Sequence, residues 1–334
     1  MYKLDTCVWE ITRKCNFNCA YCGSKAGAER ENELSTEQCL NIAKQLVDMN
    51  CRRVVIIGGE AFLKKDWDNI VKYLVDNGRD TSIITNGFLI NDFIIEKLKE
   101  TGIRHISLSI DGDRDVHDEF RTKGSFDKAI EAIKLLRENG FVTTVISTLN
   151  SKSINTIPEL YKKLKALHID AWQLQCCSPF GNASDKQYLV PSKEQLHTVC
   201  EFVARENKIA DFQIAIADNI GYHTELEHLI RGNVRMGYSG CNAGITTIGI
   251  DSVGNVRGCE SLYDDKFIEG NLLQTTLLDI WTSPTAFAYN RKFRRDMLKG
   301  KCANCDVWYK CAGGCRSFNY FYSGEMYGSC ICLK

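Results

Sequence analysis

Three cysteines near the N-terminus, Cys15, Cys19 and Cys22, are spaced as CxxxCxxC directly after an apolar run, Thr6–Thr12, that predicts a strand. Three thiolates this close together can hold a cubane iron–sulfur cluster by three of its four irons, which leaves the fourth iron open to another ligand. Zinc is the ordinary alternative, but a structural zinc takes four ligands, and the next Cys or His after the triplet is Cys39. The triplet therefore favours an iron–sulfur cluster that binds a further molecule.

The elements that must position this triplet alternate between β-rich runs and runs of helical periodicity from Thr6 to about Ala217. Strands are predicted at Cys7–Ile11, Arg53–Ile57, Ser82–Thr85, His105–Ile110, Val142–Thr148 and Ala171–Cys176. Between them, apolar residues at three- and four-residue spacing predict helices at Thr36–Met49, Asp66–Asn77, Phe93–Thr101, Phe126–Asn139 and Ile154–Leu167. Successive βα units imply a parallel sheet with right-handed crossovers, either barrel-like or doubly wound.

Polar or glycine-rich residues follow five of the predicted strands. In strand order they are the cysteine triplet, Gly58-Gly59-Glu60, Thr85-Asn86-Gly87, Ser109-Ile110-Asp111-Gly112, and Asn150. Because the carboxyl ends of parallel strands open on one side of a sheet, we expect these groups to converge on one rim.

At 334 residues the chain is long enough for one large α/β domain and a smaller one. Its formal net charge of zero gives no basic surface for nucleic acid. The N-terminus has no signal-peptide pattern and no stretch is apolar enough to span a membrane, so we expect a cytoplasmic protein without membrane contact. Seventeen cysteines in that reducing compartment are expected to be metal ligands and buried apolar residues rather than disulfides.

The distribution of the cysteines divides the chain. None lies between Cys51 and Cys176, whereas eight fall between Cys241 and Cys332. We therefore expect a large domain over residues 1–217, a connector over 218–240, and a cysteine-rich domain over 241–334. In the last of these a hairpin is predicted at Thr246–Ile250 and Asn255–Arg257, with helices at Leu277–Trp281 and Thr285–Arg295. This part has few apolar residues, so bound clusters are expected to help hold it together.

CxxxCxxC after the first strand, GGE after the second, TNG after the third and SIDG after the fourth resemble the radical S-adenosylmethionine (SAM) superfamily, in the expected order. The resemblance implies a partial (β/α)6 barrel of the TIM type. In that family three cysteines, here Cys15, Cys19 and Cys22, hold a 4Fe-4S cluster whose open iron is chelated by the amino and carboxylate groups of SAM. Reduction then cleaves SAM to a 5'-deoxyadenosyl radical that abstracts hydrogen.

The resemblance also implies which residues contact SAM. Gly58 and Gly59 would let the backbone come close to a ligand, and Glu60 would pair with the SAM ammonium. The family usually has Pro after this Glu, whereas Ala61 follows here. The plain alternative is that the glycines only make a turn.

Further SAM contacts are implied at Thr85 and Asn86 for the ribose or methionine end, at Ser109 and Arg121 for the carboxylate, and at Asn150. Arg121 lies in HDEFRTKGSF, a stretch common in this family, and its alternative is a solvated surface position. Asp111 is expected to brace the loop rather than to do chemistry.

The second cysteine set begins at Cys241, reaches Gly254 after twelve residues and Cys259 after four more. It continues with Cys302, Cys305, Cys311 and Cys315 at gaps of two, five and three, followed by a terminal Cys. This pattern resembles the SPASM domain of peptide- and sulfatase-modifying radical SAM enzymes, which carries two auxiliary iron–sulfur clusters. Taken alone, the run from Cys302 to Cys315 is also compatible with a zinc ribbon.

By this resemblance Cys241, Cys259 and Cys315 hold the first auxiliary 4Fe-4S cluster. Its fourth position is left to an open iron, a water or substrate ligand, or Cys330. The second auxiliary cluster takes Cys302, Cys305, Cys311 and one of the two terminal cysteines. Cys332 is preferred over Cys330 because its distance from Gly324 fits the usual ending of the domain.

Two further residues bear on catalysis. Cys176-Cys177 ends the sixth predicted strand, where one of two neighbouring side chains must point inward, so Cys177 is a candidate hydrogen donor. Glu260 directly follows a proposed cluster ligand, at a position where some peptide-oxidising relatives have a carboxylate base. The ordinary alternatives are a buried apolar Cys and an exposed or ion-paired Glu.

These features predict an oxygen-sensitive radical SAM and SPASM enzyme with three 4Fe-4S clusters, related to the anaerobic sulfatase-maturating enzymes. We expect it to abstract hydrogen from a ribosomally synthesised peptide or protein and to form a thioether, a carbon–carbon link or an oxidised residue. The alternatives are an epimerase or dehydrogenase acting on a peptide or on a small molecule such as an amino sugar, and a non-catalytic electron-transfer module. The chain begins at its first strand, so we expect that a separate leader-binding protein presents the substrate, that the barrel itself recognises it, or that the substrate is not a peptide. A protein such as flavodoxin or ferredoxin is the expected reductant.

Overall fold

A curved sheet of ten strands organises the computed structural model, which describes residues 2–217, 219–220, 224–231 and 239–334. The strands lie in the order β10-β9-β8-β1-β2-β3-β4-β5-β6-β7, and all neighbours from β8 to β7 are parallel. Their bounds are β1 Thr6–Glu10, β2 Arg53–Ile57, β3 Asp80–Thr85, β4 His105–Ser109, β5 Val142–Leu149, β6 Ala171–Cys176, β7 Gln213–Ile216, β8 Thr247–Ile250, β9 Asn255–Arg257 and β10 Gly270–Asn271.

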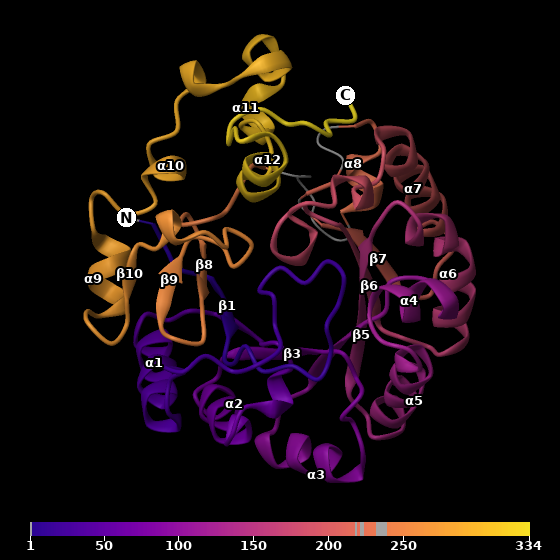
Figure 1. Cartoon of the computed structure of the whole chain (residues 1–334), viewed down its shortest axis with the longest axis vertical. Coiled ribbons are helices and arrows are strands. Elements are labelled where there is room, and N and C mark those ends of the chain that lie inside the picture. Colours follow the sequence, from indigo (N-terminus) through magenta and orange to yellow (C-terminus); the bar gives the residue numbers. More distant parts are fainter. Residues whose placement is uncertain (1, 218, 221–223, 232–238) are drawn as a thin grey trace.

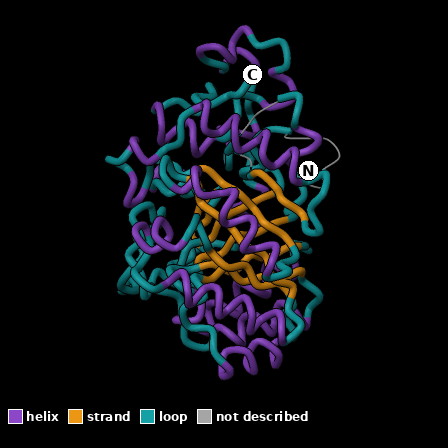
Figure 2. The backbone as a smooth tube through the Cα atoms, turned by 90° about the vertical axis from the view of Figure 1, so that its right-hand side faces the viewer, coloured by secondary structure: helices purple, strands orange, loops and turns teal. Residues whose placement is uncertain are grey.

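Helices cover the outside of this sheet (Figure 1), and in the turned view the strands lie together in the middle of the molecule (Figure 2). The helices are α1 Thr36–Asp48, α2 Trp67–Asp76, α3 Asp92–Thr101, α4 Arg114–Phe120, α5 Ser125–Glu138, α6 Ile157–Ala166, α7 Lys193–Glu206, α8 Glu227–Ile230, α9 Leu277–Thr282, α10 Ala288–Arg291, α11 Trp308–Cys311 and α12 Arg316–Ser323. None of those in the described ranges is long and apolar enough to cross a membrane.

The strands alternate between a buried face and a half-buried face, as β5 shows over its whole length. Its buried residues, among them Val145 and Leu149, belong to the main apolar core together with helix residues such as Ile133 and Leu164. The other face carries Thr144 and other half-buried residues toward the concave side of the sheet. A parallel sheet with one half-buried face suits an enzyme that binds ligands inside the curve.

The parallel sheet predicted from the βα alternation is confirmed, and its curvature agrees with the partial barrel that the family resemblance implied (Figure 1). All six predicted strands are present. The sequence reasoning missed β7, a strand of only four residues. It also missed that β8, which belongs to the cysteine-rich part, pairs in parallel with β1 and so extends the same sheet. The predicted hairpin is β8 and β9.

One helix prediction in the cysteine-rich part is wrong in extent. A helix was expected over Thr285–Arg295, but only Ala288–Arg291 is α-helical. Phe287 has a φ of 56°, in the left-handed region, which prevents a helix from running through it. Part of the predicted connector over 218–240, namely residues 218, 221–223 and 232–238, lies outside the described residues.

Candidate functional site

The cysteine triplet lies in the long loop that leaves β1 and fills the middle of the curved sheet (Figure 1). Cys15, Cys19 and Cys22 are half-buried. The backbone N–H of Phe17 donates to Cys15 Sγ and that of Ala26 donates to Cys22 Sγ, each at 3.3 Å. Hydrogen bonds of this kind stabilise thiolate charge and are used to tune iron–sulfur clusters.

The electrostatics of the loop fit a cationic metal centre. Burial raises the pKa of the Cys15 thiol to about 12, and it also raises the pKa of Cys19 although the positive charge of Arg121 opposes this. Thiolates here at neutral pH therefore need a further positive partner, which iron supplies. In the described parts of the chain no three His, Cys, Asp or Glu side chains lie close enough together to hold a single metal ion.

Gly58 and Gly59 bring the loop after β2 against the start of the triplet loop. Gly59 N donates to Thr12 O at 2.7 Å, and Glu60 N donates to Lys14 O at 2.8 Å. A Cβ at Gly58 would lie 2.9 Å from Thr12 O, and one at Gly59 would collide with the carbonyl oxygen of Lys14. These glycines therefore allow the predicted close approach, and what approaches them is the backbone of the triplet loop. This contact holds the start of that loop in place.

Glu60 is buried at the rim and gathers residues from the next strand. Thr85 Oγ1 donates to Glu60 Oε1 at 2.8 Å, and Asn86 N donates to Glu60 Oε2 at 2.9 Å. Burial raises the pKa of Glu60 to about 7, against the lowering effect of these hydrogen bonds. Asn86 Nδ2 donates to Asn16 Oδ1 at 2.8 Å, so this side chain braces the triplet loop directly.

Arg121 and Asp111 form a second anchor. Arg121 Nη2 donates to Asp111 Oδ1 at 3.2 Å and its Nε donates to Oδ2, while Asp111 also accepts from Tyr21 Oη and from Thr148 N. The Arg121 side chain is only 11% exposed, so the solvated-surface alternative is wrong. The expectation that Asp111 braces the loop is confirmed, and Ser109 lies half-buried at the end of β4 nearby.

Asn150, which follows β5, is fully buried, and its side-chain N–H group can donate a hydrogen bond to a ligand. Its Oδ1 accepts from Lys152 N at 2.8 Å and from Ser153 N at 2.9 Å. Its Nδ2 has no hydrogen-bond partner among the described residues. A buried amide nitrogen left in this way costs free energy unless a bound molecule accepts from it, which fits SAM at this rim.

The loop after β6 also holds the triplet, and the sequence reasoning missed it. Asn182 N donates to Cys22 O, and its Nδ2 donates to Cys19 O, both at 2.9 Å. Gly181 has a φ of 61° and lies so close to Cys22 that a Cβ would collide with its carbonyl oxygen. The Gly-Asn pair following the sixth strand was the available signal.

The second auxiliary ligand set surrounds one small cavity. Cys302, Cys305, Cys311 and Cys332 all line it, together with Trp308. Ser329 N donates to Cys302 Sγ at 3.3 Å. Cys330, the competing terminal residue, is exposed and directs its thiol to Gly328 O at 3.7 Å. This geometry favours Cys332 as the fourth ligand.

Two residues of the first auxiliary set, Cys241 and Cys259, pack together in an apolar cluster with Tyr289. Burial raises the pKa of Cys259 to about 12, and the charge of Cys241 adds to this. Asn290 Nδ2 donates to Cys241 O at 2.6 Å and fixes that loop. The third residue, Cys315, caps α12 by accepting from Phe318 N at 3.5 Å.

Cys176 and Cys177 lie in different apolar clusters. Cys176 belongs to the main core. Cys177 is 1% exposed and packs with Phe120 and Leu189, against Tyr21 of the triplet loop. Burial raises the pKa of Cys177 to about 12, so it is a neutral thiol, the form that holds a transferable hydrogen.

Glu260, the candidate carboxylate base, is not the exposed residue of the ordinary alternative. Its Oε2 is buried against Gly249 of β8 and has no hydrogen-bond partner within the described ranges. Burial raises the pKa of Glu260 well above its usual value, and the negative charge of Glu10 adds to the effect. The side chain thus lies beside the sheet wall, next to proposed ligand Cys259.

Two family models match the chain. The radical SAM superfamily matches residues 9–164, and the iron–sulfur cluster-binding domain named SPASM matches residues 241–306.

Similar proteins match over nearly the whole chain. The mycofactocin maturase MftC of Mycolicibacterium smegmatis is 29% identical over 319 residues, covering 94% of this chain and 78% of that protein. The AdoMet-dependent heme synthase of Methanosarcina barkeri is 28% identical over 333 residues, covering 95% and 92%. Among solved structures, Streptococcus suis SuiB bound to S-adenosylmethionine superposes with a TM-score of 0.78 at 22% identity, covering 100% of this chain and 78% of SuiB. Native anSMEcpe with bound AdoMet gives 0.74 at 18% identity, covering 98% and 93%.

Proposed function

Because the chain belongs to the radical SAM superfamily and carries a SPASM domain, we propose that it is a maturase of a ribosomally synthesised peptide or protein. Its reaction would begin with hydrogen abstraction and end with a thioether, a carbon–carbon link or an oxidised residue. The observation that supports this best is the convergence of the triplet loop with Glu60, Asn150 and the Asp111–Arg121 pair on one rim.

Each rim residue has a proposed task. Cys15, Cys19 and Cys22 hold a 4Fe-4S cluster, and this cluster with SAM supplies hydrogen abstraction from an unactivated C–H bond when both are bound. Glu60 would accept a hydrogen bond from the SAM amino group, using the lone pair that Thr85, Asn86 and Phe62 leave open. Asn150 Nδ2 would donate to SAM. Ser109 and Arg121 are proposed to bind the SAM carboxylate.

The cysteine-rich domain is proposed to hold two further 4Fe-4S clusters. Cys241, Cys259 and Cys315 would ligate one of them, and Cys302, Cys305, Cys311 and Cys332 the other. A substrate radical that becomes a link or an oxidised product must lose an electron, and clusters beside the barrel give that electron a place to go. Glu260 is proposed to take the accompanying proton, and Cys177 to be a hydrogen donor if the reaction is an epimerisation.

A precursor peptide is the proposed substrate because the mycofactocin maturase matches over most of its own length. A tetrapyrrole is the second candidate, since the heme synthase matches this chain over almost all of both proteins. Flavodoxin or ferredoxin is the proposed reductant, and a separate leader-binding protein is a proposed partner. Thiolate-bound clusters persist in a reducing compartment, which favours the cytoplasm.

Anaerobic reconstitution tests the cofactor assignment. Three cubanes predict about twelve irons and about twelve sulfides per chain. With SAM and dithionite the protein should yield 5'-deoxyadenosine, and a Cys15→Ala, Cys19→Ala, Cys22→Ala variant should lose that product while keeping about eight irons. Intact SAM beside an intact first cluster would contradict an enzymatic function, and bound zinc in place of iron would support a non-catalytic module.

Mass spectrometry then separates the substrate classes. The protein is incubated with SAM, dithionite and either peptides encoded near its gene or an iron porphyrin. Loss of two hydrogens per event on a peptide indicates a link or an oxidation. Solvent deuterium in a peptide that is otherwise unchanged indicates epimerisation. Turnover of the porphyrin, with every peptide unchanged, would favour the tetrapyrrole.

A further inference from the structure

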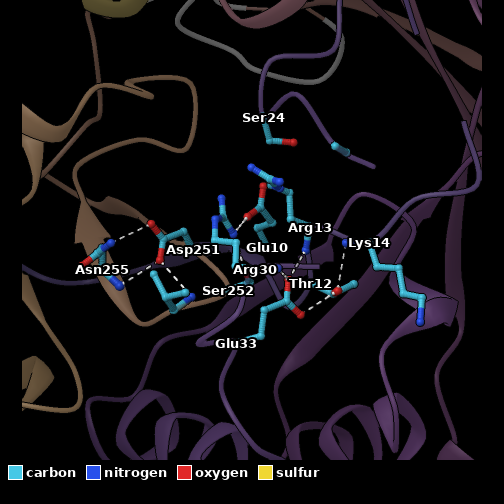
Figure 3. A network of polar contacts seen from close by, with 12 residues as sticks. Glu10, Thr12, Arg13, Lys14, Ser24, Arg30, Glu33, Asp251, Ser252 and Asn255 are labelled. Atoms are coloured by element: carbon cyan, nitrogen blue, oxygen red, sulfur yellow. Dashed lines mark hydrogen bonds and ion pairs between the residues drawn. The ribbon is translucent and has the colours of Figure 1, made fainter. Parts of the chain in front are cut away.

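Arg30 lies in the loop between the cysteine triplet and α1, and Figure 3 shows its side chain beside that of Glu10. Its guanidinium contacts three separate parts of the chain. Nη1 donates to Glu10 Oε1 at the end of β1 at 2.7 Å and also to Ser252 Oγ in the turn between β8 and β9. Nη2 donates to the hydroxyl of Tyr263. The Arg30 side chain is 19% exposed and that of Glu10 only 1%, so this is an interior network rather than a surface ion pair.

The loop that carries Arg30 is closed at its base, which fixes Arg30 relative to the triplet. Thr12 Oγ1 donates to Glu33 Oε2 at 2.8 Å, and Arg13 N donates to Glu33 Oε1 at 2.6 Å (Figure 3). Both ends of the loop are therefore tied together, with the three cysteines between them.

The network adjoins both proposed cluster ligand sets. At one end, Ser24 Oγ interacts with Glu10 and lies 3.8 Å from Cys22 Sγ. At the other end, Tyr263 directly follows the turn that begins at Cys259, which Leu262 N closes by donating to Cys259 O at 3.0 Å. Arg30 thus joins the loop of a SAM-cluster ligand to the segment of an auxiliary ligand.

The buried carboxylates around Arg30 make its positive charge important for the network. Glu10 and Glu260 each have a buried carboxylate oxygen without a hydrogen-bond partner among the described residues. The neighbouring Asp251 is already paired with Arg257, at 2.9 Å. Loss of Arg30 would leave Glu10 as a buried carboxylate without its cation, which is costly because burial removes the water that otherwise solvates it.

Arginine is the residue type that this arrangement requires. Its planar guanidinium has five N–H donors in a fixed fork, so it can hold three acceptors from different directions. A lysine would keep the charge but has a compact ammonium on a flexible stem. The Arg30→Lys variant therefore keeps the positive charge but loses the forked set of hydrogen-bond donors, so it shows which of the two the network needs.

We propose that Arg30 is a positioning residue that holds the triplet loop against the segment after Cys259 and so sets the separation of the two clusters. Since those clusters belong to the proposed function, this inference rests on it. Arg30 would also place a positive charge between the two segments that carry the proposed cluster ligands. Such a charge stabilises the reduced, more negative state and raises the reduction potential.

The test compares Arg30→Met and Arg30→Lys with the parent, after anaerobic reconstitution to equal iron content. Arg294→Met is the matched control, because Arg294 is 69% exposed and pairs with exposed Asp296. An EPR-monitored redox titration gives the cluster potentials, and pulsed EPR of the reduced protein gives the dipolar coupling between the clusters. Neither readout depends on turnover.

Arg30→Met should shift the potentials of the SAM cluster and the first auxiliary cluster to more negative values and broaden the distribution of dipolar couplings. Arg30→Lys should keep the potentials near those of the parent but still broaden the couplings. Arg294→Met should change neither. Unchanged potentials and couplings in Arg30→Met would show that Arg30 is an ordinary ion pair and would overturn the inference.

Two further results distinguish a failure of the proposed function from a failure of the positioning role of Arg30. A parent protein without clusters would contradict the proposed function itself. If Arg30→Met does not take up iron, Tyr263→Phe carries the test, because it removes one acceptor and leaves every charge in place. Tyr263→Phe should then broaden the couplings without moving the potentials, and a coupling distribution equal to that of the parent would refute the positioning role.

Discussion

Arg121 and Asp111 form a buried ion pair below the triplet loop, in which Asp111 is fully buried and also accepts from Tyr21. The Tyr21 ring lies 5.8 Å from the Arg121 guanidinium, and Tyr21 stands between Cys19 and Cys22 in the sequence. Burial tends to raise the pKa of Asp111, but the charge and hydrogen bonds of Arg121 lower it overall. The pair therefore links the end of β4 to the loop that presents the cysteines.

Asp111→Asn should destabilise the protein strongly, because it leaves the Arg121 charge buried without a partner. Breaking one side of such a pair costs about 3–5 kcal/mol. Guanidinium unfolding of the reconstituted protein under anaerobic conditions measures this. Asp296→Asn, at an exposed ion pair, is the control and should stay within about 0.5 kcal/mol of the parent. A similarly small effect of Asp111→Asn would show that the pair does not anchor the loop.

SAM affinity should rise with pH, because an ionised Glu60 accepts a stronger hydrogen bond from the SAM amino group than a neutral one does. Burial raises the pKa of Glu60 to about 7 before SAM binds, so the carboxyl is mostly neutral at pH 6 and mostly charged at pH 8. Anaerobic equilibrium dialysis at several pH values measures the Kd. Glu60→Gln should weaken binding by about tenfold at pH 8 and flatten the pH dependence.

Exposed Glu37→Gln is the matched control for Glu60 and should preserve both the affinity and its pH profile. An unchanged profile in Glu60→Gln would assign the titration to another group.

Cys332→Ser should lose one cluster, whereas Cys330→Ser should keep all three, because Cys332 and not Cys330 lines the cavity shared with Cys302, Cys305 and Cys311. The expected difference is about four irons per chain. Iron and sulfide analysis with Mössbauer spectroscopy measures it after identical reconstitution. The reverse result would exchange the two assignments.

Cys177→Ala should abolish the product while sparing SAM cleavage if Cys177 donates the hydrogen. Its place beside Tyr21 of the triplet loop makes that possible, and Cys176→Ala is the matched control because Cys176 belongs to the main core. The measurement is 5'-deoxyadenosine and modified product in the same anaerobic reaction. Normal product from Cys177→Ala would make Cys177 a packing residue only.

Local spacing and periodicity were enough to predict the parallel sheet, the six longer strands and the rim on which the motifs meet. The cysteine triplet, Glu60 and Asn150 were found in this way because each lies in the segment that follows a strand, and parallel strands bring their ends together. The four-residue strand β7 escaped because so short a run has no distinctive period.

Only the tertiary structure determined which segments that are far apart in the sequence contact each other. Arg30 contacts Ser252 and Tyr263, which are 222 and 233 positions away in the sequence. Gly59 must be a glycine because a Cβ there would collide with carbonyl oxygens of the triplet loop. A residue's own neighbours in the chain determine its strand, helix or turn. Contacts between loops depend on how the sheet curves and on β8 joining β1, which no local pattern records. The sequence by itself thus determined the cysteine sets and the rim, whereas the packing of the two halves against each other decided how those sets are connected.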